Sequence, residues 1–216
     1  MSYISLILEN LLDGTKVTLT VFALTWIFSI PLGLILALLK RSDIKVITYL
    51  LDLYTWIIRG TPLLLQLFFV VYGLPILFGD FFLVPELWGA IITFIINYTA
   101  YFIEIFRGGM NAIPKNQYEA ASVLSLSKRQ TFLYILLPQT FKKTLPSIAN
   151  ETITLVKDTA LISAVAISDL MRNTKDTVAR DFRVEAYFVA AIIYLVLTYV
   201  LVYIFKKIEK KKAYYR

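Results

Sequence analysis

Long apolar runs without any charged residue dominate the chain. Four of them are each about 17 to 23 residues long: Val17–Leu39, Gly60–Gly79, Leu87–Ile103 and Ala186–Phe205. Because an α-helix rises about 1.5 Å per residue, roughly 20 residues cross the hydrocarbon core of a bilayer, which is about 30 Å thick. The pattern therefore predicts four membrane-spanning helices. We expect the second to begin near Ile47 and to run through Arg59.

The stretch between Gln130 and Ser168 has a different pattern. Its apolar pieces, at 131–141, 144–150 and 159–168, are separated by charged residues and by a proline, and none is long enough to span a membrane alone. One interpretation is an amphipathic domain in the cytoplasm. The other is a fifth span that faces protein or water, where polar groups are tolerated because lipid does not contact them.

Lysine and arginine are distributed unevenly between the connecting segments. They follow the first, third and fourth runs, whereas the second and third runs are separated by Asp80 and Glu86 with no basic residue. The basic residues are Lys40, Arg41 and Lys45; Arg107, Lys115, Lys128 and Arg129; and Lys206, Lys207, Lys210, Lys211, Lys212 and Arg216. Since cytoplasmic loops are enriched in basic residues, this pattern places the N-terminus outside and the C-terminus in the cytoplasm.

The orientation decides between the two interpretations of residues 130–168. With only four spans, the basic segment after the third run and the basic C-terminal tail could not both be cytoplasmic, so this region must cross once. We therefore predict an all-α polytopic membrane protein with five transmembrane helices, forming a single domain over residues 1–216.

The first 13 residues differ from a secretory signal. They contain Glu9 and Asp13 and lack a basic region at the start. We expect a short amphipathic helix on the outer membrane interface, which Gly14 ends.

Composition excludes several classes of function. Hydrophobic residues make up 58% of the chain and charged residues 17%, with a mean hydropathy of +0.70, whereas soluble domains are roughly 45–50% apolar. The net charge of +7 indicates cytoplasmic loops of a membrane protein and not a nucleic-acid-binding surface. With no cysteine and no histidine, thiolate metal sites and the commonest general base are excluded, and we predict no catalytic or metal site.

Two groups of polar residues lie at membrane depth. Asn97 and Tyr101 share one helix face with Glu104. Glu151, Thr154 and Asp158 share a face in the same way. A carboxylate at the centre of a bilayer costs about 2.5–3.5 kcal/mol, so such residues are candidates for binding a polar substrate. Structural ion pairs with Lys157 and the arginines are the alternative.

The two carboxylates on the interrupted segment favour a cationic ligand. Glu151 and Asp158 are two helical turns, or about 10.5 Å, apart, so they could hold opposite ends of a basic amino acid. Arg59 or Arg107 could bind its α-carboxylate. Arg107 could instead pair with the acid one turn before it, and Arg59 equally suits a helix break beside Pro62.

The cytoplasmic segment at about 114–130 carries two helix-start signals. Asn116 with Glu119, and Ser127 with Gln130, fit capping boxes. They predict a short helix near Gln117–Leu124 and a second helix from Lys128.

The predicted short helix has a small apolar face, formed by Tyr118, Ala121 and Leu124. Such a face is expected to dock on a partner, or else to pack on the ends of the chain's own spans.

This segment resembles the EAA coupling loop of ABC-importer permeases. The resemblance lies in Glu119-Ala120-Ala121 and in the later Leu137-Pro138. In that family the loop forms a short helix that inserts into a cleft of the ATPase subunit. The family usually has a glycine six residues after the glutamate, where this chain has Ser125, and serine tolerates a positive φ less well than glycine.

Three further segments are similar to the amino-acid branch of the family, the histidine/glutamine/arginine permease type. They are Arg59–Gln66, Ala100–Ile113 and Asn150–Leu161, and they agree with that branch in order and spacing. No phosphate-binding loop of the form G-x-x-x-x-G-K-[ST] occurs in the sequence, so a separate subunit must hydrolyse ATP.

The resemblance implies a permease subunit of an ATP-driven importer for polar amino acids in the bacterial plasma (inner) membrane, and the acids favour a cationic one: arginine, lysine or histidine. Implied partners are a cytoplasmic ABC ATPase dimer that holds ATP-Mg, a second permease copy (identical or a sister chain) and an extracytoplasmic amino-acid-binding protein. The chain itself is expected to hold no cofactor. A permease for glutamine or other polar amino acids, and a passive channel subunit, are the alternatives.

The expected coupling residues are Tyr118, Glu119, Ala120, Ala121, Leu124 and Ser125. The expected substrate-binding residues are Arg59, Asn97, Tyr101, Glu151, Thr154 and Asp158.

Overall fold

The structure is a computed structural model that describes residues 3–42, 44–79 and 82–213, the side chains of the last two excepted. These residues form helices and no strand, as predicted. The α-helices are α1 (Tyr3–Leu39), α2 (Lys45–Gly60), α3 (Leu63–Phe68), α4 (Leu74–Phe78), α5 (Glu86–Asn111), α6 (Lys115–Val123), α7 (Lys128–Gln130), α8 (Leu137–Asp158), α9 (Leu170–Asp181) and α10 (Glu185–Ala213). Phe69–Gly73 and Thr131–Leu136 are π-helical, and Thr159–Val165 is a 3-10 helix. Asp80 and Arg216, used above for the charge pattern, lie outside the described residues.

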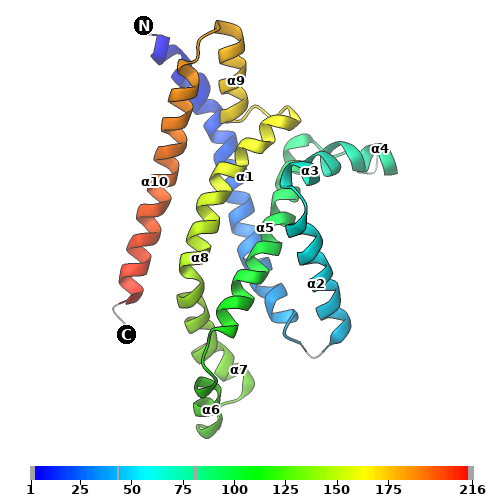
Figure 1. Ribbon diagram of the computed structural model, residues 1–216, viewed down its shortest axis with the longest axis vertical. Helices are drawn as coiled ribbons and strands as arrows, with labels where there is room; N and C mark the ends of the chain where they lie inside the picture. Colours follow the sequence, from blue (N-terminus) through cyan, green and yellow to red (C-terminus); the bar gives the residue numbers. More distant parts are fainter. Residues whose placement is uncertain (1–2, 43, 80–81, 214–216) are drawn as a thin grey trace.

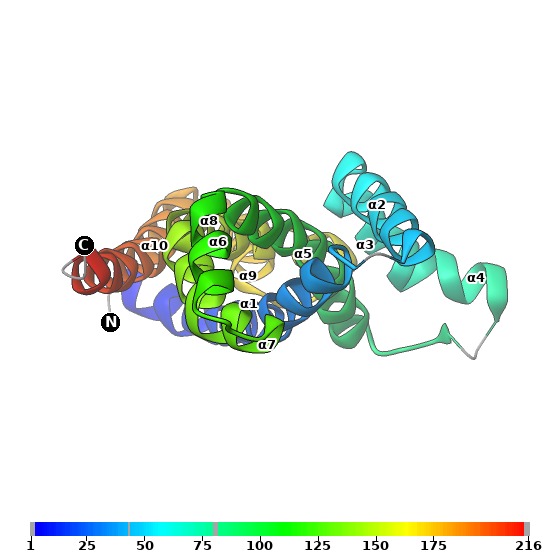
Figure 2. The same cartoon turned by 90° about the horizontal axis from the view of Figure 1, so that it is seen from below.

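The long helices run side by side along the molecule (Figure 1). Helix α5 packs on α1, α2 and α8, and α8 packs in turn on α10. Helix α9 lies at one end, and α6 and α7 lie at the other, toward which the end of α10 also points. Seen from below, α2, α3 and α4 lie to one side and α10 to the other (Figure 2).

Length and apolar composition identify three described helices that could each cross a membrane: α1, α5 and α10. The second predicted span is different, because it is not one continuous helix. Helix α2 and residues 63–78 together are apolar enough for a fourth span, but they meet at an angle of 103°. The prediction that the second helix begins near Ile47 and runs through Arg59 agrees with α2, whereas the charge-free run after it turns away.

The bend between α2 and α3 has a local cause. Thr61 is extended, with φ −119° and ψ 147°, because the following Pro62 disfavours the helical conformation in the residue before it. The Gln66 side chain then fixes the turn, since its amide donates hydrogen bonds to the Ile58 carbonyl at 2.8 Å and to Thr61 Oγ1 at 2.7 Å.

The prediction of a separate N-terminal helix ended by Gly14 is wrong. Helix α1 is continuous over 37 residues and passes through Gly14. The glycine is needed for a different reason: a Cβ atom there would lie 2.7 Å from the backbone carbonyl of Asp169. Asp169 is buried and caps α9 by accepting a hydrogen bond from the Arg172 N–H at 2.8 Å, and its burial raises the pKa of its carboxyl to about 6.

Replacing Gly14 by valine is expected to lower the stability of the protein by about 1–3 kcal/mol, because the start of α9 must move away from α1. Thermal unfolding in detergent measures this effect. The matched control is Gly108→Val, since a Cβ at Gly108 on α5 meets nothing within 4 Å. Equal melting temperatures for the two variants would contradict the close-packing role of Gly14.

The interrupted segment at 130–168 forms no separate pieces up to Asp158. From Lys128 the chain stays helical through α7, the π-helical stretch and α8. Pro146 lies within α8 without ending it. The helix persists because one face is buried against the rest of the molecule, and at Gly109 of α5 an added Cβ would overlap the Thr144 methyl group. Small residues allow such close packing of membrane helices.

Only one of the two predicted capping boxes is present. Ser127 and Gln130 form theirs at the start of α7, so this prediction is confirmed. The prediction for Asn116 is wrong, because α6 begins one residue earlier at Lys115, follows Pro114 and has no side-chain cap. The short helix itself is present, as predicted. Ser125 follows it with a φ of 52°, the left-handed conformation usually adopted by glycine.

Candidate functional site

The predicted residue Asp158, at the end of α8, contacts a tyrosine of α5. The hydroxyl of Tyr98, on α5, donates a hydrogen bond of 2.8 Å to Asp158 Oδ2. Tyr98 is buried, so it fixes this carboxylate from within the helix bundle. The sequence analysis did not single out Tyr98, although it lies next to the predicted Asn97 and one turn before Tyr101.

A second group brings together the end of α2 and the interiors of α5 and α8. The Arg59 guanidinium lies over the Tyr101 ring, 5.3 Å from its centre, in a cation–π contact. Arg59 and Asp158 also act electrostatically on Glu151. Glu151 is half-buried, and no hydrogen-bond partner for its carboxylate lies among the described residues. Arg59, Tyr101, Glu151 and Asp158 thus form one cluster, which we call the acidic cluster.

Asn97 lies beside this cluster and not within it. Its side chain is buried and donates a hydrogen bond of 2.9 Å to Gln66 Oε1. Gln66 is the residue that fixes the bend between α2 and α3, so Asn97 ties this bend to α5. The Thr154 hydroxyl donates a hydrogen bond of 3.1 Å to the Asn150 carbonyl of its own helix.

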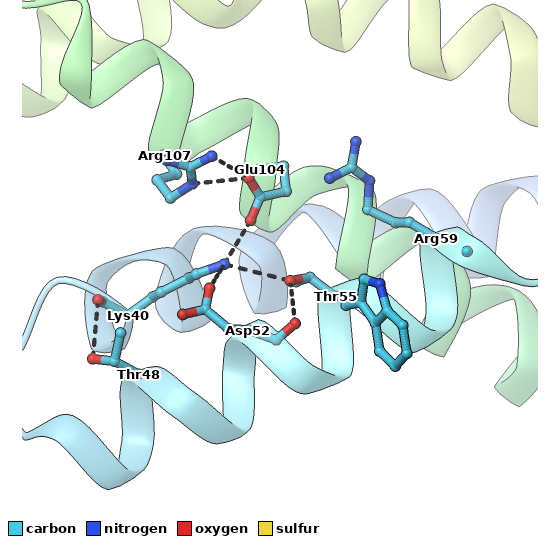
Figure 3. A pocket seen from close by; sticks show the side chains of 9 residues that line it. Lys40, Thr48, Asp52, Thr55, Arg59, Glu104 and Arg107 are labelled. Carbon is cyan, nitrogen blue, oxygen red and sulfur yellow. Dashed lines mark hydrogen bonds and ion pairs between the residues drawn. The ribbon is translucent and has the colours of Figure 1, made fainter.

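Glu104 belongs to a separate site, although it shares a helix face with Asn97 and Tyr101. It accepts hydrogen bonds from Arg107 Nε at 2.8 Å and from Lys40 Nζ at 2.7 Å, and Lys40 also pairs with Asp52 at 2.7 Å (Figure 3). The pairing of Arg107 with Glu104 confirms the structural alternative for this arginine. These residues line an open cavity of about 750 Å³ together with Arg59.

Lys40, like Arg107, is a residue of this site that the sequence analysis assigned to a cytoplasmic segment. Its side chain is only 7% exposed and links α1 to α2 and α5. No signal in the sequence pairs it with Glu104, which is 64 positions away.

Replacing Lys40 by methionine keeps the length of the side chain but removes both ion pairs. We expect a loss of about 1–3 kcal/mol in stability, because a buried charged partner loses a hydrogen bond. Thermal unfolding in detergent measures it. The control is Lys16→Met, since the Lys16–Asp13 pair is largely exposed, and such pairs contribute little. A melting temperature as low for the control as for Lys40→Met would contradict the linking role.

No metal site is evident in the described part of the chain. Groups of three or more acidic side chains that could hold a metal ion are absent from it.

A family model for the inner membrane component of binding-protein-dependent transport systems matches residues 29–214. The chain belongs to this family. The permease resemblance derived from the sequence motifs is thereby confirmed.

Curated relatives cover nearly the whole chain. It is 38% identical over 202 residues to the arginine transport system permease protein ArtQ of Bacillus subtilis, covering 93% of this chain and 91% of ArtQ. It is 31% identical over 202 residues to the glutamine transport system permease protein GlnP of Escherichia coli, with 93% and 92% covered. These relatives are named as transport permeases and not as enzymes.

Solved structures agree with this permease family. A crystal structure of an amino acid ABC transporter with histidines matches with a TM-score of 0.88 and 31% identity, over 98% of this chain and 99% of that one. The MetNI methionine ABC transporter, in an inward-facing conformation, matches with a TM-score of 0.73 at 15% identity, over 98% and 99%. The latter supports the fold alone.

Proposed function

We propose that the chain is the permease subunit of an ATP-driven importer for polar amino acids, and that cationic amino acids (arginine, lysine and histidine) are its preferred substrates. The observation that carries this proposal is the half-buried Glu151 carboxylate, which has no hydrogen-bond partner among the described residues and lies within electrostatic range of Asp158 and Arg59. An unpaired carboxylate in a partly dry site favours a cationic donor.

The acidic cluster offers complementary groups to both ends of a basic amino acid. Glu151 would bind the cationic side chain, and Arg59 would bind the α-carboxylate. Asp158, oriented by its bond from Tyr98, would accept from the α-ammonium group. Tyr101 would line the site, while Asn97 and Thr154 would support it from α5 and α8.

The names of the relatives support amino acids as the substrate class but do not agree on one. ArtQ is named for arginine and GlnP for glutamine. A permease for glutamine or another polar amino acid is therefore the second candidate, since the neutral amide of glutamine can also donate to Glu151.

We further propose five spans, made by α1, α2, α5, α8 and α10. Helix α8 is too polar to be identified by composition, but it lies between α5 and α10, where protein shields its polar groups from lipid. The N-terminus would then be outside. The basic ends of α1 and α10 and the short helix α6 would all lie on the cytoplasmic side, at the lower end of Figure 1.

Helix α6 is the proposed docking element for a cytoplasmic ABC ATPase dimer, which would hold ATP-Mg. Ala121 is buried and Tyr118 half-buried against the chain itself, whereas Glu119 and Ala120 are exposed and Leu124 is 69% exposed. The exposed side of α6 is thus free to contact a partner. A second permease copy (identical or a sister chain) and an extracytoplasmic amino-acid-binding protein complete the proposed assembly in the bacterial plasma membrane.

Reconstitution of the chain with its ATPase and binding protein in proteoliposomes tests this function. We expect accumulation of labelled arginine that requires ATP hydrolysis. A passive channel would instead equilibrate arginine without nucleotide, and that result would reject the proposal.

A further inference from the structure

A groove of about 200 Å³ lies between α8 and α10, and none of its lining residues belongs to the acidic cluster or to α6. Its lining residues are Pro146, Ala149, Asn150, Ile153, Val202, Phe205, Lys206 and Glu209. The groove has two chemical parts: most of its lining is apolar, and the amide, ammonium and carboxylate groups are confined to three of its residues.

The position of the groove along α10 is set by the sequence. Residues 186–205 carry no charge and are long enough to cross the hydrocarbon core, and Lys206 is the first charged residue after them. The polar part of the groove therefore lies where the hydrocarbon meets the lipid headgroups. Its apolar part extends along α10 from Phe205 back to Val202, toward the centre of the bilayer.

Positive charge is concentrated at this end of α10. Lys206, Lys207, Lys210 and Lys211 are all exposed, and Glu209 is the only acidic residue among them. Glu209 also lines the groove, three positions after Lys206, but the four lysines leave this end of the helix with an excess of positive charge.

We propose that this groove binds one anionic phospholipid of the adjacent leaflet. The lipid phosphate accepts hydrogen bonds from Lys206 and from the Asn150 amide, and an acyl chain lies against Ile153 and Val202. The neighbouring lysines attract the negative headgroup, as basic pockets between membrane helices do for anionic lipids. A free phosphate ion would use the same polar groups, but the apolar walls favour a lipid over an ion.

Native mass spectrometry of the delipidated full chain in detergent measures this binding directly. The two probes are phosphatidylglycerol, which is anionic, and phosphatidylcholine, which is zwitterionic. We expect the wild-type chain to prefer phosphatidylglycerol, and Lys206→Gln to weaken that binding about fivefold, the effect of one basic residue at an anionic lipid surface. The matched control is Lys211→Gln, which removes the same charge from the same helix outside the groove and is expected to change binding by less than about twofold.

A second variant tests the apolar part of the groove without changing its charge. Val202→Trp fills the groove next to Ile153, and we expect it to reduce phosphatidylglycerol binding at least as much as Lys206→Gln does. Its melting temperature in detergent shows whether the protein remains folded.

Three outcomes would overturn the proposal. Equal losses for Lys206→Gln and Lys211→Gln would indicate diffuse attraction to the lysine run. Equal binding of the two lipids by the wild-type chain would indicate an apolar groove without headgroup recognition. Displacement of the lipid by inorganic phosphate at equal concentration would indicate a site for a free anion. None of these results involves transport, so they are independent of the proposed function.

Discussion

Arginine uptake is expected to fall about 10- to 100-fold when Glu151 is replaced by glutamine. The substitution keeps the size of the side chain and removes its charge. A hydrogen bond to a charged group contributes about 1.5–3 kcal/mol, and Glu151 has no hydrogen-bond partner among the described residues that could account for such a loss within the protein itself. Initial rates of ATP-driven uptake in proteoliposomes measure the effect.

The same variant separates charge recognition from a general defect. Uptake of glutamine, which is neutral, should change by less than about threefold. The matched control is Glu86→Gln, which removes an exposed carboxylate at the start of α5 and should leave uptake of both amino acids unchanged. An equal loss of arginine and glutamine uptake in Glu151→Gln would reject the cation contact.

The second large effect is expected at α6. Glu119→Lys reverses an exposed charge on the short helix proposed to enter the ATPase, and like charges placed across an interface cost several kcal/mol. We expect the ATPase to be lost from the purified complex and uptake to stop, while the chain remains folded. Size-exclusion chromatography and thermal unfolding in detergent measure the two properties.

The control for this variant is Glu9→Lys, which makes the same charge change at an exposed position near the start of α1. This end of α1 lies at the opposite end of the molecule from α6 (Figure 1). It should retain the ATPase. If Glu119→Lys also retains the ATPase and normal uptake, α6 does not dock the ATPase.

The hydrophobic pattern predicted that the protein is all-helical. It also predicted the helices that are apolar along most of their length. Helices α1, α5 and α10 are recognisable because nearly every residue in a long window is apolar. A helix break beside Pro62 was one of two interpretations of Arg59, and the pattern did not decide between them, because a charge-free run looks the same whether it is straight or turned. Helix α8 was predicted as a crossing only from the distribution of basic residues, because its polar residues interrupt the apolar pattern although packing keeps the helix continuous.

The candidate site was predicted in part for a related reason. Helical spacing correctly places Asn97, Tyr101 and Glu104 on one face of α5, but spacing within one helix gives no information about what that face contacts. The partners come from distant segments: Gln66 for Asn97, and Lys40 for Glu104. The roles of the predicted substrate and coupling residues stay predictions.

The glycine at position 14 illustrates the same limit. From the sequence it fits a helix end, because glycine is common there. Its actual environment is set by the backbone of Asp169, which lies more than 150 positions away. Such requirements arise from tertiary contacts and leave no local signal.

The central claim is that the acidic cluster selects cationic amino acids for ATP-driven import. Competition against labelled arginine in proteoliposomes that contain the wild-type chain, its ATPase and its binding protein tests it most directly. Unlabelled arginine and lysine should each suppress ATP-dependent uptake strongly. Glutamine should be at least about tenfold weaker as a competitor at the same concentration, because it lacks one hydrogen bond between charged groups. Suppression by glutamine equal to or stronger than that by lysine would contradict the account.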